Sequence, residues 1–585
     1  MMNSVFVQLR RRRESLLERP FWRLASHFVS RLFSAGSSDS EESALGLGVG
    51  AILALLAAPG GFITIFLFSK YSSTIRFAHN ITNFDAYSAS LSDQYFFLAY
   101  SLSITGIATI LKWDSIFPDR RDYMNLAPLP VPTRHIFLAN FVAILSIAVL
   151  FAFDVNAVSA VFFPVLVTME KRFADFLRFA PMHAGGVLLA SLFIFFALFA
   201  LIGTLMLLLP RALFRRLSLY LRVSLVVVLL ALLSTSLVVP NLIRAPGPHP
   251  ILRWLPTVWF LELSRSWIGQ ADPQFSWLAP FAARATIGVV LWAAAVYVIS
   301  YYRHFIRIPE MLDVKISRGN LRFRIPVWME KILLRDPFER GCYAFALKTL
   351  FRNDLHSLLA GAFAGLGLVM SSQILLDAVT RRFSVRGAIP DSDFLAAPLV
   401  LAYFIVCGLR FVFELPAELK ANWVHQAIVD RDKNRLVPLA RKLLLTFVWP
   451  WLILLALPTY AHFWGWTLAL EHIAFLLLVT FCLADLLLRR YRKIPFTCGY
   501  SAWKQSATVR IVMHGMGFLA CAAIVPDLER SFLIKGPFAL PVVCALIFAA
   551  WLWFKRQDRD EYVDTSLIFE DSPEPAVEVL SLSRL

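Results

Sequence analysis

Few ionisable side chains lie inside the long apolar segments of this chain, and those few are the first candidates for chemistry. Glu471, His472 and Asp485 fall in one apolar segment, and His514 falls in the next. A charge inside a bilayer is costly and often marks a proton relay or a substrate path. Glu471 therefore suggests an ion-coupled transporter. A role in helix packing or at the membrane interface is the simpler interpretation of Glu471, His472 and Asp485.

The sequence offers no catalytic or metal-binding constellation. His249, Glu262 and Asp272 share one predicted external loop, but their wide spacing matches no short metal-ligand motif. The Gly-Lys pair of a nucleotide-binding P-loop does not occur anywhere in the chain. We therefore expect no catalytic residues, no metal and no cofactor, and any ATP-driven work requires a separate subunit. A membrane enzyme or scaffold stays open as an alternative.

The composition places these residues in a membrane protein. Hydrophobic residues make up 58% of the chain and charged residues 17%, whereas soluble domains are nearer half apolar and a quarter charged. Residues 223–239 and 538–554 are apolar runs without a charge, as a bilayer core about 30 Å thick requires. The net charge of +17 is explained by Lys and Arg that face the cytoplasm and its anionic lipids, so we expect no nucleic-acid partner.

Apolar runs long enough to cross the bilayer predict an all-α polytopic membrane protein with about 12 transmembrane helices. The first six predicted spans are 44–69, 94–112, 136–153, 183–209, 219–239 and 281–302, and the second six are 357–378, 394–415, 442–460, 466–488, 507–526 and 537–554. Residues 155–169 fit either an extension of the third helix or an interfacial piece. With both termini in the cytoplasm, cytoplasmic loops hold roughly three times as many Lys and Arg as external loops, which is the bias expected of membrane proteins.

A basic segment separates two six-helix halves, and an amphipathic surface helix precedes each half. Before the first half, Leu17, Phe21, Leu24, Phe28 and Leu32 recur at steps of three and four, and residues 338–351 repeat this pattern before the second half. Such helices would lie along the cytoplasmic membrane surface. The predicted parts are a cytoplasmic N-terminal segment 1–43, a transmembrane half 44–302, a linker 303–356, a second half 357–554 and an acidic cytoplasmic tail 555–585.

A charged cytoplasmic loop follows the second span of each half. The first loop, 112–134, contains Asp119, Arg120, Arg121 and Asp122, followed by three closely spaced prolines and Arg134. Prolines stiffen such a segment and prevent a long helix, so the loop could present a fixed surface to a partner. The second loop, 414–442, contains Glu418 and Lys420. A tight turn between two membrane helices is the simpler interpretation of the prolines.

In the order of these parts the sequence resembles the permease subunits of type-2 ABC exporters. The likeness rests on an amphipathic helix, two spans, a charged loop that ends in Leu126-Ala-Pro-Leu-Pro-Val-Pro-Thr-Arg134, and four further spans. The segment Leu255-Pro-Thr-Val-Trp-Phe-Leu-Glu-Leu263 also looks like the short external helices that the family carries between its fifth and sixth spans. Family permeases usually have six spans and pair as two subunits, so this chain resembles a fused form. Its second half lacks a clear Leu-Pro-Leu-Pro counterpart.

The resemblance implies a permease of the bacterial inner membrane that exports a substrate with energy from separate nucleotide-binding ATPase subunits. It makes Asp119, Arg120, Arg121, Asp122, Arg134, Glu418 and Lys420 candidates for coupling to the ATPase, and Trp259, Phe260 and Glu262 candidates for an external gate. The lipid bilayer is the other expected partner. A lipid-like or amphiphilic substrate and homo-oligomerisation both stay open.

Overall fold

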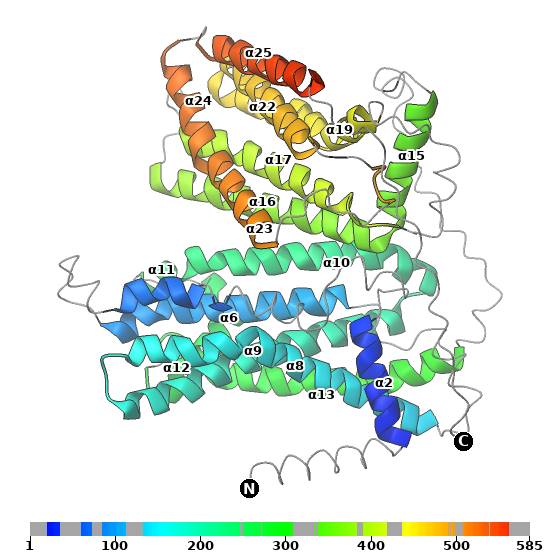
Figure 1. Ribbon diagram of the computed structural model, residues 1–585. Helices are drawn as coiled ribbons and strands as arrows, with labels where there is room; N and C mark the ends of the chain where they lie inside the picture. Colours follow the sequence, from blue (N-terminus) through cyan, green and yellow to red (C-terminus); the bar gives the residue numbers. More distant parts are fainter. Residues whose placement is uncertain are drawn as a thin grey trace. The chain divides into compact units, whose positions relative to one another are not determined.

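The protein is an all-α, multi-pass membrane protein. The computed structural model describes residues 20–34, 60–61, 63–72, 85–112, 133–245, 250–270, 272–307, 334, 337–382, 390–417, 436–489, 491, 493–497, 507–536 and 539–560. Every regular element within these ranges is a helix (Figure 1). A helix satisfies all its backbone hydrogen bonds internally, which is what a chain in lipid needs.

Within the described ranges, nine helices are long and apolar enough to cross a membrane. They cover Ala86–Leu111, Arg134–Thr168, Phe173–Leu208, Leu217–Leu237, Leu278–Ile299, Asp354–Leu376, Ser392–Val412, Pro438–Trp464 and Trp466–Leu487. Each coincides with one of the spans predicted from the apolar runs. The predicted segment 44–69 falls largely outside the described residues, although 63–71 are helical. Residues 507–526, and residues 539–554 of the predicted segment 537–554, are helical too, the first through a π-helical turn and the second as a shorter apolar helix.

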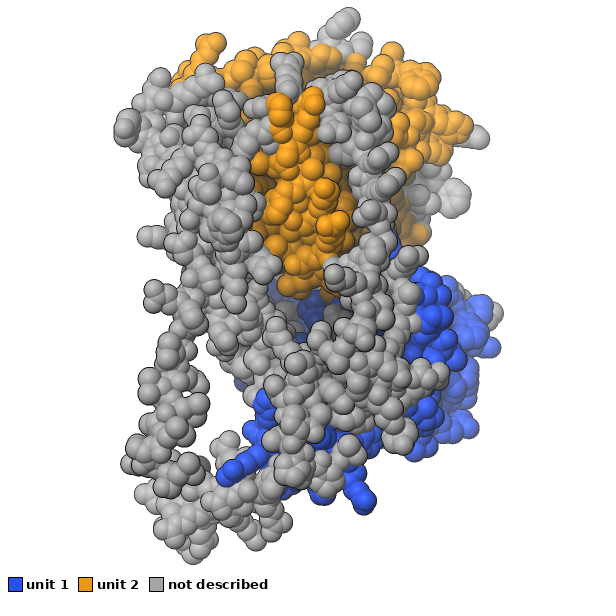
Figure 2. Space-filling model, turned by 90° about the vertical axis from the view of Figure 1, so that its right-hand side faces the viewer, with its two compact units in different colours: residues 1–318 blue, residues 319–585 orange. Residues whose placement is uncertain are grey.

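The chain divides into two compact units, residues 1–318 and 319–585 (Figure 2). The division falls inside the basic segment 303–356.

Unit 1 is organised around two helices that lie side by side, α6 and α9. Its elements are α2 (Pro20–Ser34), α6 (Ala86–Leu111), α8 (Thr133–Thr168), α9 (Phe173–Leu208), α10 (Arg211–Ser234), η2 (Thr235–Leu237), α11 (Val239–Arg244), η3 (Pro250–Trp254), α12 (Pro256–Ile268) and α13 (Leu278–Arg307). Helix α9 packs against α6, α8, α12 and α13, and α10 packs against α6. Helix α6 is therefore enclosed by protein along most of its length, and its side chains face other helices instead of lipid.

Helices α8 and α9 are longer than a bilayer core requires. Each has 36 residues, which gives about 54 Å at 1.5 Å per residue against a core of about 30 Å. Residues 155–168 are the continuation of α8, so they are not a separate interfacial piece. Both helices extend beyond the lipid core.

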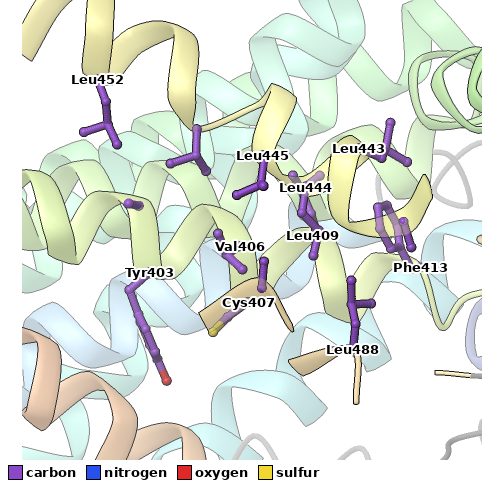
Figure 3. Close-up of a cluster of buried hydrophobic side chains, with 14 of the residues drawn as sticks. Tyr403, Val406, Cys407, Leu409, Phe413, Leu443, Leu444, Leu445, Leu452 and Leu488 are labelled. Atoms are coloured by element: carbon purple, nitrogen blue, oxygen red, sulfur yellow. The ribbon is translucent and has the colours of Figure 1, made fainter. Parts of the chain in front are cut away.

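Unit 2 has α17 at its centre. Its elements are α15 (Pro337–Arg352), α16 (Asp354–Arg382), α17 (Ser392–Val412), α19 (Leu436–Thr446), α20 (Trp449–Trp451), the π-helical turn η7 (Leu452–Ala456), α21 (Leu457–Trp464), α22 (Trp466–Leu487), α23 (Ala507–Leu519), the π-helical turn η8 (Ala520–Ile524), α24 (Val525–Ile534) and α25 (Ala539–Asp560). Helix α17 packs against α16, α19, α22 and α24. Figure 3 shows the resulting core, in which Val406 and Leu409 of α17 lie beside Leu444 and Leu445 of α19.

The first helix described in each unit docks on the spans that follow it. In α2, Ala25 and Phe28 are buried against Ile136 and Ala139 at the start of α8. In α15, Tyr343, Leu347 and Leu350 belong to the core of unit 2, together with α17 and α19. An apolar stripe of this kind needs an apolar partner, and in both helices that partner includes protein.

Candidate functional site

The interior of unit 1 contains a network of small hydroxyl and amide side chains centred on Ser191 of α9. The Ser191 hydroxyl lies 2.6 Å from the Ser101 hydroxyl and accepts hydrogen bonds from Thr105 of α6 (3.0 Å) and Asn156 of α8 (2.9 Å). Ser101 also donates to the backbone carbonyl of Val187. Interhelical hydrogen bonds among small side chains hold membrane helices closely together. The network thus joins three spans without a charge.

The predicted external segment forms α12, a short helix wedged among α6, α9 and α13. Its Thr257 hydroxyl donates to the Tyr95 hydroxyl of α6 (2.7 Å), and Tyr95 lies 2.8 Å from the Thr235 hydroxyl in η2. Proline at the first helical position and Gly269 in the left-handed conformation at the end limit α12 to 13 residues. Its hydrogen bond to α6 fixes α12 against the buried span.

The three residues proposed for an external gate occupy different environments on α12. Phe260 is fully buried and packs against Phe193 of α9, with ring centroids 5.4 Å apart. Trp259 is half-buried and donates from Nε1 to the backbone carbonyl of Arg253. Glu262 is only 1% exposed and accepts a hydrogen bond from the backbone N–H of Asp272. Burial raises the pKa of Glu262 to about 6.

An ion pair that the sequence analysis did not single out lies in the N-terminal half of α6, close to Tyr95 in the sequence. Lys70 Nζ is 2.6 Å from Asp93 Oδ2, and the Tyr71 hydroxyl donates to the same carboxylate oxygen. Asp93 precedes the predicted span 94–112 by one residue, which is why it escaped notice as a membrane carboxylate. In the structure α6 begins at Ala86, so Asp93 lies inside the helix.

The intramembrane candidates Glu471 and His472 do not act as a pair. Glu471 is half-buried, whereas His472 is fully buried and its Nδ1 lies 2.6 Å from Oε1 of Glu529 on α24. Consecutive residues on a helix point about 100° apart, so they face different neighbours. Glu529 lies three residues beyond the predicted span 507–526. Helix α24 continues past Pro526, and that proline at the start of a helix is the signal that could have revealed it.

Asp485 belongs to a set of ion pairs at the opposite end of α22. Its carboxylate accepts from Arg441 of α19 (2.5 Å) and from the Trp551 Nε1 of α25 (2.9 Å). Nearby, Lys442 of α19 pairs with Glu339 of α15 at 2.8 Å. Each contact joins two helices, so the role that the geometry supports for Asp485 is structural.

Arg410 lies at the same end of α22 as Asp485. It is buried, pairs with Glu414 at 2.9 Å, and donates from Nε to the backbone carbonyl of Leu487 at the end of α22. A cation at a helix C-terminus is favoured by the helix dipole. The chain after Glu414 is held by Ala417, whose N–H donates to the carbonyl of Phe496. This hydrogen bond therefore fixes the position of the first residues of the second charged loop.

Most of the proposed coupling residues lie outside the described ranges. Arg134 is described and is exposed in the first turn of α8. Asp119, Arg120, Arg121, Asp122, Glu418 and Lys420 are outside, as is His249. Among the residues that the structure does describe, no group of three or more His, Cys, Asp or Glu side chains could hold a metal ion.

No protein-family model matches the chain, and comparisons with curated proteins and with solved structures find no match either.

Proposed function

We propose that this protein is the permease component of an ATP-driven exporter, with ATP hydrolysis on separate subunits. The observation that carries the proposal is the order of elements in unit 1. The amphipathic helix α2 comes first and is followed by two helices, one that ends at Tyr71 and then α6. A charged, proline-rich segment separates α6 from α8. Short helices interrupt the chain between α10 and α13. This is the order that the sequence shares with type-2 ABC permeases.

The proposed topology has about 12 spans in two halves, with both termini in the cytoplasm of a bacterium. The nine candidate spans, the helix that ends at Tyr71, the bulged helix formed by α23, η8 and α24, and the apolar helix α25 together account for this number. Helices α2 and α15 would then occupy equivalent positions ahead of each half. The resulting orientation puts the charged loops on the cytoplasmic side and α12 on the external side.

In this proposal the loop 112–134 transmits the movement of the ATPase to α8 and α6. The loop connects these two helices directly, and α2 packs across the start of α8. A force applied to the loop would therefore reach the Ser191 network, which joins α6, α8 and α9. Helix α12 would form the external end of the path. The transported substrate is not assigned, and the Phe- and Leu-rich spans are compatible with an amphiphile.

The test is co-purification of the full-length chain from native membranes. We expect an ATPase with a P-loop to accompany the wild-type protein, and we expect replacement of Asp119, Arg120, Arg121 and Asp122 by Ala to reduce its recovery at least tenfold, as the loss of about 1.4 kcal/mol of binding free energy would. The ATPase would be identified by mass spectrometry and quantified against the bait.

A matched control replaces Glu170, Lys171, Arg172 and Asp175 by Ala. This set also removes two acidic and two basic side chains, but it lies where α8 gives way to α9, with Asp175 in the first turn of α9, on the proposed external side. Recovery of the ATPase should be unchanged in the control. Equal loss in both variants, or the absence of any nucleotide-binding partner from the wild-type preparation, would reject the proposal.

A further inference from the structure

Unit 2 contains a titratable pair that export by an external ATPase does not require. His472 and Glu529 are 0% exposed, and the distance of 2.6 Å between Nδ1 and Oε1 means that a proton lies between the two atoms. The other polar atom of each side chain, His472 Nε2 and Glu529 Oε2, is buried without a hydrogen-bond partner within the described part of the chain. Leaving buried polar atoms unpaired is costly, and in native proteins such atoms call for an explanation.

Several other groups face this pair from the helices packed around it. The Tyr460 ring of α21 lies 4.6 Å from the His472 ring, and its hydroxyl donates to the carbonyl of Phe394. On α25, Cys544 is close enough to interact electrostatically with Glu529 and Glu471. The nearest basic group on α24, Arg530, is directed to Asp391 at 3.0 Å, ahead of α17. Among the residues that the structure describes, these contacts bring no further basic side chain to the pair, so its charge state depends on its own protons.

The helices that bring Tyr460 and Glu529 to His472 carry the same irregularity. The π-helical turn η7 ends two residues before Pro458, and the π-helical turn η8 ends two residues before Pro526. Proline cannot supply the backbone hydrogen bond of a regular helix, and single π-helical turns often occur where a helix bends or functions. Tyr460 and Glu529 follow these prolines within one turn. The pair is thus placed next to two points where the helices can bend.

We propose that His472 and Glu529 form a proton-binding site, and that exchange of this proton is coupled to loosening of the contact that the pair makes between α22 and α24. Burial favours the net-neutral pair, which shares one proton between Nδ1 and Oε1. Uptake of a further proton makes the pair cationic, and loss of a proton makes it anionic. Either charge is costly in an apolar site. Proton exchange therefore requires the helices to separate and admit water.

The site is tested on the full-length protein in nanodiscs by infrared difference spectroscopy during acid titration. Every protein in this experiment carries Glu262→Gln, because the buried Glu262 would add a carbonyl band of its own. Protonation of a buried carboxylate produces such a band, which we expect in this background and after the further change Glu471→Gln, but not after Glu529→Gln. In His472→Gln the band should persist with a midpoint moved to higher pH by about one unit or more, because the cationic partner that favours the carboxylate is gone. A band that survives Glu529→Gln in the Glu262→Gln background would overturn the site.

The link to helix contact is tested by hydrogen–deuterium exchange of peptides covering 520–534, after correction for the intrinsic pH dependence of exchange. Exchange should vary with pH in the wild type and in Glu471→Gln, and the variation should vanish in Glu529→Gln. If the single variant does not fold, the double variant His472→Gln, Glu529→Gln replaces the pair by two amides that can hydrogen bond to each other. Persistent pH-dependent exchange in the folded variant would overturn the link. Neither measurement depends on an ATPase partner.

Discussion

Glu262 shows how a single buried carboxylate can be tolerated at the edge of a membrane protein. It lies on α12, where the Asp272 N–H supplies one hydrogen bond to a side chain that is almost fully buried. That bond offsets only part of the cost of burial, so the pKa of Glu262 is raised to about 6. Lys70 and Asp93, in contrast, neutralise each other.

We predict that Glu262→Gln changes the pH dependence of stability. The folded pKa of about 6 exceeds the reference value of 4.5, so ionisation of Glu262 opposes folding, and stability is lost as the pH rises from about 4.5 through about 6. The linked free energy is about 2 kcal/mol. The melting temperature of Glu262→Gln relative to wild type should therefore increase between pH 4.5 and pH 7, as measured in detergent.

The comparison variant is Asp272→Asn, which keeps the backbone N–H that donates to Glu262 but removes a negative charge that adds to the raised pKa of Glu262. Its melting temperature relative to wild type should rise between pH 4.5 and pH 7 by less than that of Glu262→Gln. If Glu262→Gln and the wild type differ by the same amount at pH 4.5 and pH 7, Glu262 does not titrate with a raised pKa.

At the scale of the helices, close packing depends on glycine at particular crossings. A Cβ atom added at Gly408 of α17 would collide with Cβ of Phe363 on α16, and one added at Gly367 of α16 would lie 2.8 Å from Cβ of Phe404. Both neighbours are atoms fixed to the backbone, so the helices themselves would have to move. Small residues at such crossings allow membrane helices to approach closely.

We predict that Gly408→Ala destabilises unit 2 by about 1–3 kcal/mol, the usual cost of overpacking. The matched control is Gly515→Ala on α23, where an added Cβ meets nothing within 4 Å. That substitution should be neutral or should stabilise by up to about 1 kcal/mol, because alanine favours the helix. Thermal unfolding of the purified variants measures both. A Gly408→Ala protein as stable as wild type would show that α16 and α17 are not held this closely.

At the scale of the whole molecule, each unit concentrates its strong ionic contacts near helix ends. In unit 2, Arg410, Arg441 and Asp485 gather at one end of α22, while His472 and Glu529 lie toward the other. Between these ends the core is apolar, as Figure 3 shows around α17. This distribution follows the cost of charge in lipid, which is greatest at the centre of the bilayer and falls toward its surfaces.

The proposed orientation predicts the labelling of introduced cysteines in intact cells. Trp254→Cys replaces a side chain that is 81% exposed in η3, and it should react with a membrane-impermeant maleimide added outside. Arg134→Cys, at the start of α8, should react only after the cells are permeabilised. The wild-type protein gives the background, since its five described cysteines are buried or half-buried. The reverse pattern of labelling would invert the proposed topology.

The sequence by itself determined the helical membrane class and the positions of the long spans. An apolar run of the required length is a local property, because lipid demands it of every residue in the segment. The apolar stripe of α2, read from Phe21, Leu24 and Phe28, was equally local. The sequence also drew attention to His472, since an ionisable residue inside an apolar run can be recognised without any knowledge of the tertiary structure.

Only the tertiary structure decided which polar groups meet. Glu529 lies 57 residues from His472, and Ser191 meets Ser101 and Asn156 from two other helices. Helical periodicity gives the face on which a side chain lies, but the partner on that face depends on which helices pack together and at what depth. The sequence paired Glu471 with His472 because they are adjacent in the chain, whereas the packing of both α22 and α24 against α17 and α25 brings Glu529 to His472 instead.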